Sequence, residues 1–234
     1  MEFQEKSLAL YKKEGDKENI ASTLHNMAII YRRTGNHVKA LEYYNQSIMI
    51  NKSINNQKGI ANSLAGIGVI YSKQGNYPKA ITYIDEGLKI NEQLGDQTGI
   101  ADFQINIGSV YLEQGDDVKA LEYFNESLNF YKEQDNLYRL SEILNNIGLT
   151  SQNQGDYDQA LSYFNQNKTI NERLDNKIGI ANDLNAIGLV YDNLGDDKKA
   201  LDYYNQSFKI QKEFRDKNGM AKYLLHGENH DNVA

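Results

Sequence analysis

Tyr71 to Ala80 read YSKQGNYPKA, and close versions of this decamer end at Ala40, Ala120, Ala160 and Ala200. The copies are forty residues apart, without insertion or deletion. A fixed period of this length is typical of stacked supersecondary units, in which each unit packs mainly on its neighbours. The sequence therefore predicts a single elongated repeat array instead of one globular core.

The decamer contains the signals of a turn between two helices. Glycine occupies the Gly75 position in every copy and can take the left-handed conformation that ends a helix. Asn76, or aspartate in the same place, can cap the next helix, and Pro78 falls in its first turn, where a missing N–H costs little. The apolar stripe from Ile60 to Tyr71 predicts a first helix, helix A, and a second, helix B, begins directly after the turn.

The composition favours an all-helical chain. One proline occurs in 234 residues, and there are no alternating β-branched runs. The absence of cysteine excludes disulfides and thiolate metal sites and makes the cytoplasm the default compartment. The net charge of −7 opposes binding to nucleic acid, because clustered Lys and Arg supply most of that affinity. No signal pattern and no apolar run of the ~20 residues that span a membrane is present, so no membrane attachment is expected.

Residues at fixed positions of helices A and B match a known family pattern. They are Leu64, Ile67, Gly68 and Tyr71 in helix A, and Ala80, Ile84 and Gly87 in helix B. This arrangement of small and large residues resembles the tetratricopeptide repeat (TPR) family over about residues 1–225. The resemblance implies an all-α, right-handed α-α superhelical solenoid of about five complete helix pairs, with a half-unit at each end.

The repeat period divides the chain into units. A half-unit at 1–15 precedes five units at 16–55, 56–95, 96–135, 136–175 and 176–215, and a second half-unit occupies 216–225. Residues 226–234 do not continue the template, so a frayed or disordered tail is expected. The period is longer than the usual thirty-four residues of the family. Charged residues also replace the proline that commonly follows helix B. This longer variety resembles the arrays of spindle-orientation adaptors and of bacterial regulators that couple TPRs to kinase or cyclase domains.

The resemblance also implies that residues of helix A line a concave groove that binds peptides or partner helices. The matching groove positions selected as candidate contacts are Asn62, Lys73, Asp102, Asn106, Glu113, Glu142, Asn145, Asn146, Asn182 and Asn185. Asparagine offers both a donor and an acceptor, which suits pairing with the backbone of an extended ligand, and Asn106 and Asn146 are the preferred contacts. The alternative interpretation is that these are solvated polar residues on an unused face.

Charge along the predicted groove is uneven. Arg32, Arg33 and Lys73 lie toward the first units, and acidic residues follow, which could orient a ligand with its acidic part toward the N-terminal units. The carboxylate clamp of chaperone-binding TPRs is not reproduced. Its positions are occupied by His25, Ile29, Gly66, Asp102 and Asn106. Chaperone tails are therefore not expected as ligands.

The junction of the third and fourth units departs from the repeat. Residues 137–141 read LYRLS where the second unit has QKGIA, and Ser151 replaces the tyrosine of helix A. Asn167 and Lys168 stand where small and apolar residues are usual. Drift in one tolerant unit would explain this, and so would a bend or an extra contact site. The histidines in residues 226–230 do not follow the zinc-protease order, and neither a metal nor another cofactor is expected.

Three functions from different classes remain open. The first is a non-catalytic protein-interaction scaffold that holds a peptide or helical segment in the groove. The second is the regulatory or sensory array of a larger signalling protein, such as a kinase or cyclase. The third is a self-associating array, because the half-units leave apolar faces at Phe3 and Leu8 and at Met220 and Leu224. No set of acid, base and nucleophile stands out from the repeat, so an enzyme is not expected.

Overall fold

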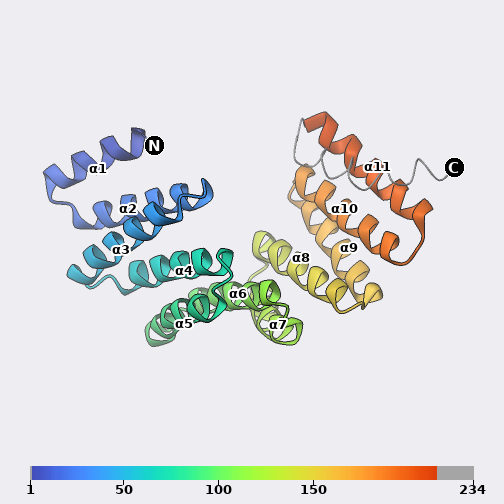
Figure 1. The fold of residues 1–234 in the computed structure, drawn as a ribbon, viewed down its shortest axis with the longest axis horizontal. Coiled ribbons are helices and arrows are strands. Elements are labelled where there is room, and N and C mark those ends of the chain that lie inside the picture. Colours follow the sequence, from blue (N-terminus) through green and yellow to red (C-terminus); the bar gives the residue numbers. More distant parts are fainter. Residues whose placement is uncertain (1, 215–234) are drawn as a thin grey trace. The chain divides into compact units, whose positions relative to one another are not determined.

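The computed structural model describes residues 2–214, which fold into eleven α-helices joined by short turns (Figure 1). They are α1 (Glu2–Glu14), α2 (Lys17–Arg33), α3 (His37–Ser53), α4 (Gln57–Lys73), α5 (Tyr77–Leu94), α6 (Gln97–Gln114), α7 (Asp117–Glu133), α8 (Leu137–Asn153), α9 (Tyr157–Arg173), α10 (Lys177–Asn193) and α11 (Asp197–Phe214). No strand occurs among these residues, which confirms the predicted all-α class. The predicted half-unit at 216–225 and the tail at 226–234, with its histidines, lie outside the described residues. None of the described helices is long and apolar enough to cross a membrane.

The helices belong to two compact units, each described by itself. Unit 1 spans Met1–Tyr123 and unit 2 spans Phe124–Ala234, so the boundary falls within α7. In unit 1, each of the helices α1 to α5 packs on the helix that follows it, and α4 also contacts α2 and α6. In unit 2, α9 packs on both α8 and α10, and α10 packs on α11. The pairs α2–α3, α4–α5, α8–α9 and α10–α11 are the A–B helix pairs that the sequence period predicts.

The turns follow the chemistry predicted from the decamer. Gly75 has a φ of +74°, and Asn76 accepts a hydrogen bond from the backbone N of Lys79 at 3.3 Å. Pro78 lies in the first turn of α5. The turns from helix B to the next helix A also contain a left-handed residue. The residues in this conformation are Gly15, Asn55, Gly95, Asp135 and Asp175. Asparagine and aspartate tolerate it better than other side chains do, which explains their use beside glycine.

Small residues bring the two helices of a pair close together. Ala80 and Ile84 on α5 are fully buried against α4. A β-carbon at Gly68 would lie 2.5 Å from Ile84 Cγ1 and 3.1 Å from the carbonyl oxygen of Ala80. A side chain at this position would therefore push the helices apart, because a packed core has no spare volume to receive it.

A stack of two tyrosines and a lysine joins helix A to helix B on the outside of this contact. The Tyr71 and Tyr83 rings have centroids 5.5 Å apart and planes inclined by 7°, and Lys79 Nζ lies 5.1 Å from the centre of the Tyr71 ring. The same stack recurs as Tyr31–Tyr43 with Lys39, Tyr111–Tyr123 with Lys119, and Tyr191–Tyr203 with Lys199. Ring stacking and the cation over the ring face both stabilise the pair.

The fourth repeat lacks this stack. Ser151 takes the place of the helix A tyrosine, is fully buried, and donates a hydrogen bond from Oγ to Gln159 Oε1 at 2.8 Å. Tyr163 retains the helix B ring. The irregularity noted in the sequence at Ser151 is thus a local exchange of ring stacking for one hydrogen bond.

A second recurring contact joins helix B to the next helix A. Asn91 on α5 is buried, and a β-carbon at Gly99 on α6 would lie 2.3 Å from Asn91 Oδ1. The same pairing is found between Asn51 and Gly59 and between Asn171 and Gly179. Where Tyr131 replaces the asparagine, Arg139 replaces the glycine. The glycine therefore leaves the space that the amide side chain of the asparagine occupies.

Replacing Gly99 by alanine should destabilise the α5–α6 contact by about 1–3 kcal/mol, because the added methyl group overlaps the Asn91 side chain. The change Asn91→Ser removes that overlap, so the double variant should lose less than the sum of the two single variants. Urea denaturation of the four proteins measures this coupling. Additive losses would contradict the packing argument.

Rebuilding the missing stack should stabilise unit 2. Ser151→Tyr together with Gln159→Lys is expected to raise the free energy of unfolding by about 1 kcal/mol, through stacking on Tyr163 and a cation over the new ring. The matched control is Lys79→Gln in the second repeat, which removes the cation and should cost about 0.5–1 kcal/mol. Thermal unfolding followed by circular dichroism compares them. A loss of stability on rebuilding would mean that the fourth repeat has no room for the ring.

Candidate functional site

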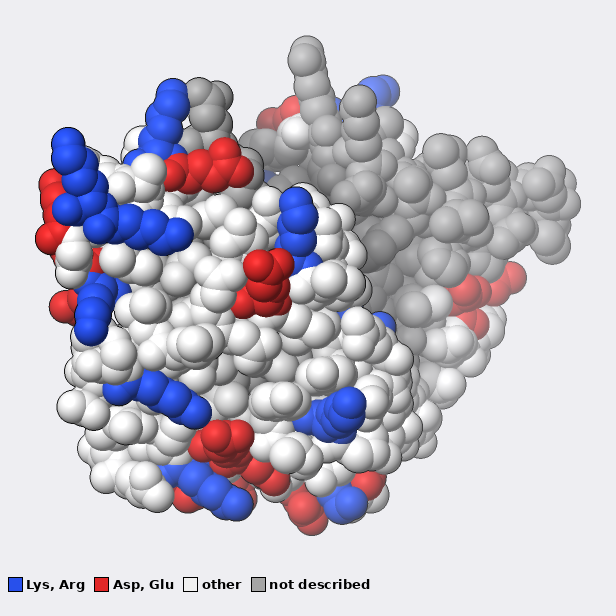
Figure 2. All heavy atoms as spheres, turned by 60° about the vertical axis from the view of Figure 1, so that its left-hand side comes forward, with Lys and Arg blue, Asp and Glu red and all other residues white. Residues whose placement is uncertain are grey.

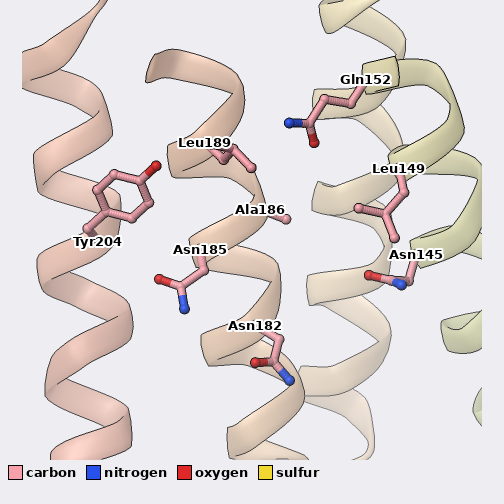
Figure 3. Close-up of a pocket in the computed structure, with 8 residues that line it drawn as sticks. All are labelled: Asn145, Leu149, Gln152, Asn182, Asn185, Ala186, Leu189 and Tyr204. Atoms are coloured by element: carbon pink, nitrogen blue, oxygen red, sulfur yellow. The ribbon is translucent and has the colours of Figure 1, made fainter. Parts of the chain in front are cut away.

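Unit 2 contains a cavity of about 400 Å³, the unit 2 pocket, with walls from α8, α10 and α11 (Figure 3). Its lining consists of Asn145, Leu149, Gln152, Asn182, Asn185, Ala186, Leu189 and Tyr204. Figure 3 shows Asn145 and Leu149 projecting from α8 toward Asn182 and Ala186 on α10. Three of the residues predicted from the sequence, Asn145, Asn182 and Asn185, are therefore brought together here.

The side-chain amide of Asn185 is the polar centre of this pocket. Both Oδ1 and Nδ2 of Asn185 are buried and have no hydrogen-bond partner among the described residues. Oε1 of Gln152 is buried in the same way. An unpaired buried polar group costs about 1–3 kcal/mol, and most such groups in folded proteins are paired. The pocket therefore presents amide groups that a bound molecule or water can satisfy.

Tyr204 forms the wall of the pocket that comes from α11. The side chain is 2% exposed, and a β-carbon at Gly188 would lie 2.7 Å from Tyr204 Cε1, so the ring packs directly on α10. Burial, and to a lesser extent the negative charge of Asp192, raises the pKa of Tyr204 to about 12. The hydroxyl group therefore keeps its proton at neutral pH.

A second cavity of unit 2, the polar cavity, lies beside the pocket and has a volume of about 270 Å³. It is lined by Ser141, Glu142, Asn145, Asn167, Asn171, Asn176, Gly179, Asn182 and Asp183. Asn145 and Asn182 line both cavities, so the two are direct neighbours. The predicted residue Glu142 is also placed here, and the lining contains no apolar side chain.

Asp183 is the buried carboxylate of the polar cavity, with 1% of its surface exposed. Its Oδ1 accepts a hydrogen bond from Asn167 Nδ2 at 2.6 Å, and its Oδ2 accepts one from Asn171 Nδ2 at 2.7 Å. Burial raises the pKa of Asp183 to about 6, although the two hydrogen bonds act in the opposite direction. The carboxylate is thus mostly ionised at neutral pH in a place where charge is costly.

In unit 1, two of the predicted groove residues pair with each other. Lys73 Nζ forms an ion pair with the Glu113 carboxylate, and Ser72 Oγ donates a hydrogen bond to it. Together with Asn106 these residues line a small cavity of about 50 Å³. The charge of Lys73, expected to make the N-terminal units basic, is therefore balanced locally by Glu113.

Unit 1 also has a cavity at the repeat position of the polar cavity, with a volume of about 210 Å³. The predicted residue Asn62 lines it, together with His25 and Asn51. His25 Nδ1 lies 3.2 Å from Ser63 Oγ, and burial, assisted by the charge of Arg32, lowers the pKa of His25. The imidazole is therefore neutral at neutral pH.

The other predicted residues lie outside the two cavities of unit 2. Asp102 is half-buried on α6, and Asn146 is half-buried on α8. Sequence reasoning missed Gln152, Tyr204 and Asp183 as parts of a site. Asp183 did carry a signal, because the equivalent residues in the other units are uncharged. They are Thr23, Ser63, Phe103 and Ile143.

Charged side chains of both signs share the face drawn in Figure 2. Lys and Arg lie beside Asp and Glu on this face. The ion pair of Lys58 with Asp96, at 2.6 Å, joins neighbouring repeats. The face shows no basic track of the kind that a phosphate backbone requires. Among residues 2–214, no group of three His, Cys, Asp or Glu side chains is arranged to hold a metal ion.

Comparison with known proteins agrees with the repeat geometry. A family model described as tetratricopeptide repeat matches residues 2–53, 59–133 and 139–213. The chain belongs to the tetratricopeptide repeat family. No curated protein matches it. The TPR fold is generally a non-catalytic scaffold.

Solved structures share this TPR fold at low sequence identity. BtubC from P. vanneervenii is 17% identical with a TM-score of 0.78, and the match covers 91% of this chain and 90% of that one. The Rap conjugation gene regulator of the plasmid pLS20, in complex with the Phr* peptide, is 18% identical with a TM-score of 0.77, covering 95% and 62%. Aspartyl phosphate phosphatase F from Bacillus subtilis is 13% identical with a TM-score of 0.78, covering 92% and 57%. The chain spans about six-tenths of the last two proteins, and the likeness concerns the fold alone.

The buried carboxylate of Asp183 should make the stability of unit 2 depend on pH. Its pKa is about 6 in the folded chain against an ordinary value of 3.8, so the folded state binds the proton more tightly than the unfolded state does. The contribution of Asp183 to the free energy of unfolding should therefore fall as the pH rises from about 4 to about 6, by on the order of 3 kcal/mol, and level off above that range.

Asp183→Ser, which introduces the residue found at Ser63, should remove this component. Urea denaturation of both proteins from pH 4 to pH 8 gives the difference between their unfolding free energies. As the pH rises, the free energy of unfolding of the variant should increase relative to that of the wild type. A difference that does not vary with pH would contradict the assignment.

Proposed function

We propose that this TPR array is a non-catalytic protein-interaction scaffold whose unit 2 pocket binds an extended peptide segment of a partner protein. The observation that carries the proposal is the Asn185 side chain, whose two polar atoms are buried without a partner. A peptide group has one N–H and one C=O, so a side-chain amide can pair with both. Binding would then satisfy groups that the free chain leaves unpaired.

The surroundings of Asn185 fit the same ligand. Asn145 and Asn182 add two further amides, from α8 and α10, at the edge where the two cavities meet. Leu149 and Leu189 offer apolar surface for one side chain of the ligand. Ligand pockets commonly combine such apolar walls with a few polar groups that fix orientation. Backbone pairing would give affinity, and the apolar wall would give selectivity.

The comparisons support the proposal without deciding it. The Rap regulator of pLS20 has this fold and is described in complex with the Phr* peptide, which supports peptide binding by the fold. Phosphatase F has the fold as well, but at 13% identity its named activity does not transfer to this chain. The pocket lining here consists of amides, aliphatic groups and a phenol. We place the scaffold in the cytoplasm, the default compartment of a chain without cysteine.

A second candidate is the regulatory array of a larger signalling protein. The Rap regulator and phosphatase F favour it, because in both proteins the part matched by this chain is about six-tenths of the whole. The predicted self-association is a third candidate. The apolar side chains exposed on α1 favour it, because Phe3 is 78% exposed and Leu10 is 53% exposed.

Asn185→Leu should separate binding from folding. Leucine removes two buried, unpaired polar atoms at similar volume, so the free energy of unfolding should rise by about 1 kcal/mol. The same change should weaken peptide binding by at least about tenfold, because the backbone of the ligand loses its partner. An array of acetylated random hexapeptides identifies ligands of the wild type. Fluorescence anisotropy with the strongest hit then measures the variants.

The matched control is Asn165→Leu on the exposed side of α9, which should leave the affinity unchanged. Equal affinity of the wild type and Asn185→Leu would contradict the proposed site. Failure of the wild type to bind any peptide of the array would contradict peptide binding by the pocket as a whole.

A further inference from the structure

The carboxylate of Asp183 is a buried negative charge without a cation bound to it. Its two hydrogen bonds come from Asn167 and Asn171, which are neutral donors. Within the described part of the chain, Asp183 forms no ion pair. Buried charges in proteins are usually paired, because an uncompensated charge loses the solvation that water would give it.

The cations near the polar cavity are already matched by other carboxylates. Lys168 on α9 acts on Asp183 through its charge, but its Nζ pairs with Glu172 at 2.9 Å. Arg139 on α8 pairs through Nη1 with Glu142 at 2.7 Å. At the start of α10, Lys177 pairs with Asp175 at 3.2 Å. Each of these cations has its own carboxylate, so the charge of Asp183 is the excess one.

The fold of this junction does not require the charge. The corresponding place in unit 1 is occupied by Ser63, whose Oγ donates a hydrogen bond to Ser47 Oγ at 3.3 Å. Ser47 and Ser63 correspond to Asn167 and Asp183 after a shift of three repeats. A neutral pair therefore builds the same contact between helix B and the next helix A. Packing therefore does not explain why the pair of Asn167 and Asp183 contains a carboxylate.

We propose that the polar cavity receives a cationic group, the ammonium of lysine or the guanidinium of arginine, from the peptide that occupies the unit 2 pocket. This inference rests on the proposed function of that pocket. The two cavities share Asn145 and Asn182, so one short segment can reach both. The preferred partner is then a segment with a basic residue next to an apolar one.

The groups around the cavity suit such a ligand chemically. Asp183 supplies the uncompensated negative charge, the rim residue Glu142 balances Arg139, and Ser141 and the shared asparagines supply further acceptor oxygens. A guanidinium or ammonium group has several donors to satisfy, and its hydrogen bonds to carboxylates are stronger than those between neutral groups. A bound cation also favours ionised Asp183, so protonation of this carboxylate near pH 6 should oppose binding.

The test is a grid of hexapeptides, Ac-Gly-Ser-X-Z-Ser-Gly-NH2, in which X and Z are every pair of natural amino acids and both termini are uncharged. At pH 7.5 the wild-type chain should retain peptides that pair Leu, Ile, Met or Phe with Arg or Lys. Exchange of that Arg for Gln should weaken binding by about tenfold or more. On lowering the pH to 5.0, this Arg-to-Gln ratio should shrink.

Two variants and one control assign the effect to the cavity. Asp183→Ser, which copies the neutral residue at Ser63, and Glu142→Gln should lose the preference for Arg over Gln while the need for an apolar residue remains. Asp202→Asn on α11 makes the same change in net charge on an exposed helix surface and should keep the preference. Circular dichroism establishes that each protein is folded. In Asp183→Ser the ratio of the affinities for the Arg and Gln peptides should no longer depend on pH between 5.0 and 7.5.

The outcomes separate this inference from the proposed function. Binding of apolar peptides with no preference for a basic residue would overturn the cationic site and leave the peptide pocket standing. No binding of any peptide would overturn both. Saturable binding of spermidine alone, unaffected by Leu189→Glu in the pocket, would assign the cavity to a free cation instead of a peptide. A preference that survives Asp183→Ser would remove Asp183 from the site.

Discussion

The close approach of helix A to helix B is the constraint on which each repeat depends. At the α4–α5 contact a hydrogen atom on Gly68 faces Ile84 and the backbone of Ala80, and there is no room for a methyl group. The equivalents of Ala80 are alanine in every unit, and all are fully buried. Because this contact joins helices adjacent in the chain, it forms each pair without reference to the open face of helix A. That face is free to differ between units.

In unit 2, the open face of α10 carries residues that lower the stability of the fold. Asn185 keeps two buried polar atoms unpaired, although the equivalent residues Ala65 and Ile105 show that apolar side chains fit the same repeat position. Asp183 keeps a buried charge where Phe103 and Ile143 are apolar. Both costs fall on α10, beside cavities with a common boundary. Groups that weaken a fold and lie in adjoining cavities are more simply explained by binding than by packing.

The local chemistry of the chain allowed the fold to be predicted, whereas the site depends on contacts between distant residues. Gly75, Asn76 and Pro78 act within one turn, so their roles followed from the sequence alone. Helical periodicity placed Asn182 and Asn185 on the open side of one helix A. It could not show that Asn185 is buried without a partner, because this depends on how Tyr204 and α8 close the pocket.

Contacts between residues sixteen apart in the chain also could not be predicted from the sequence, and they explain how the junctions between repeats differ. Each such pair consists of one residue on helix B and one on the next helix A. Three such pairs are Ser47 with Ser63, Gly87 with Phe103, and Asn167 with Asp183. Each of these three pairs is matched in size or in hydrogen bonding, whereas the sequence, taken one position at a time, shows only irregular residues. The partner of an unusual residue becomes visible once the helices are stacked.

These matched pairs let one backbone frame carry different chemistry at successive junctions. Phe103 fills the space above Gly87, so that junction is apolar, whereas Ser63 beside His25 gives a polar cavity without a buried carboxylate. Asp183 beside Asn167 gives an acidic one. Ligand preference is therefore set by the side chains that face each other at a junction, and a replacement there leaves the turn and the helix contact as they are. The decamer that identifies the fold therefore carries no information about the ligand. Ligand preference depends on residues on the open and junction faces of the helices.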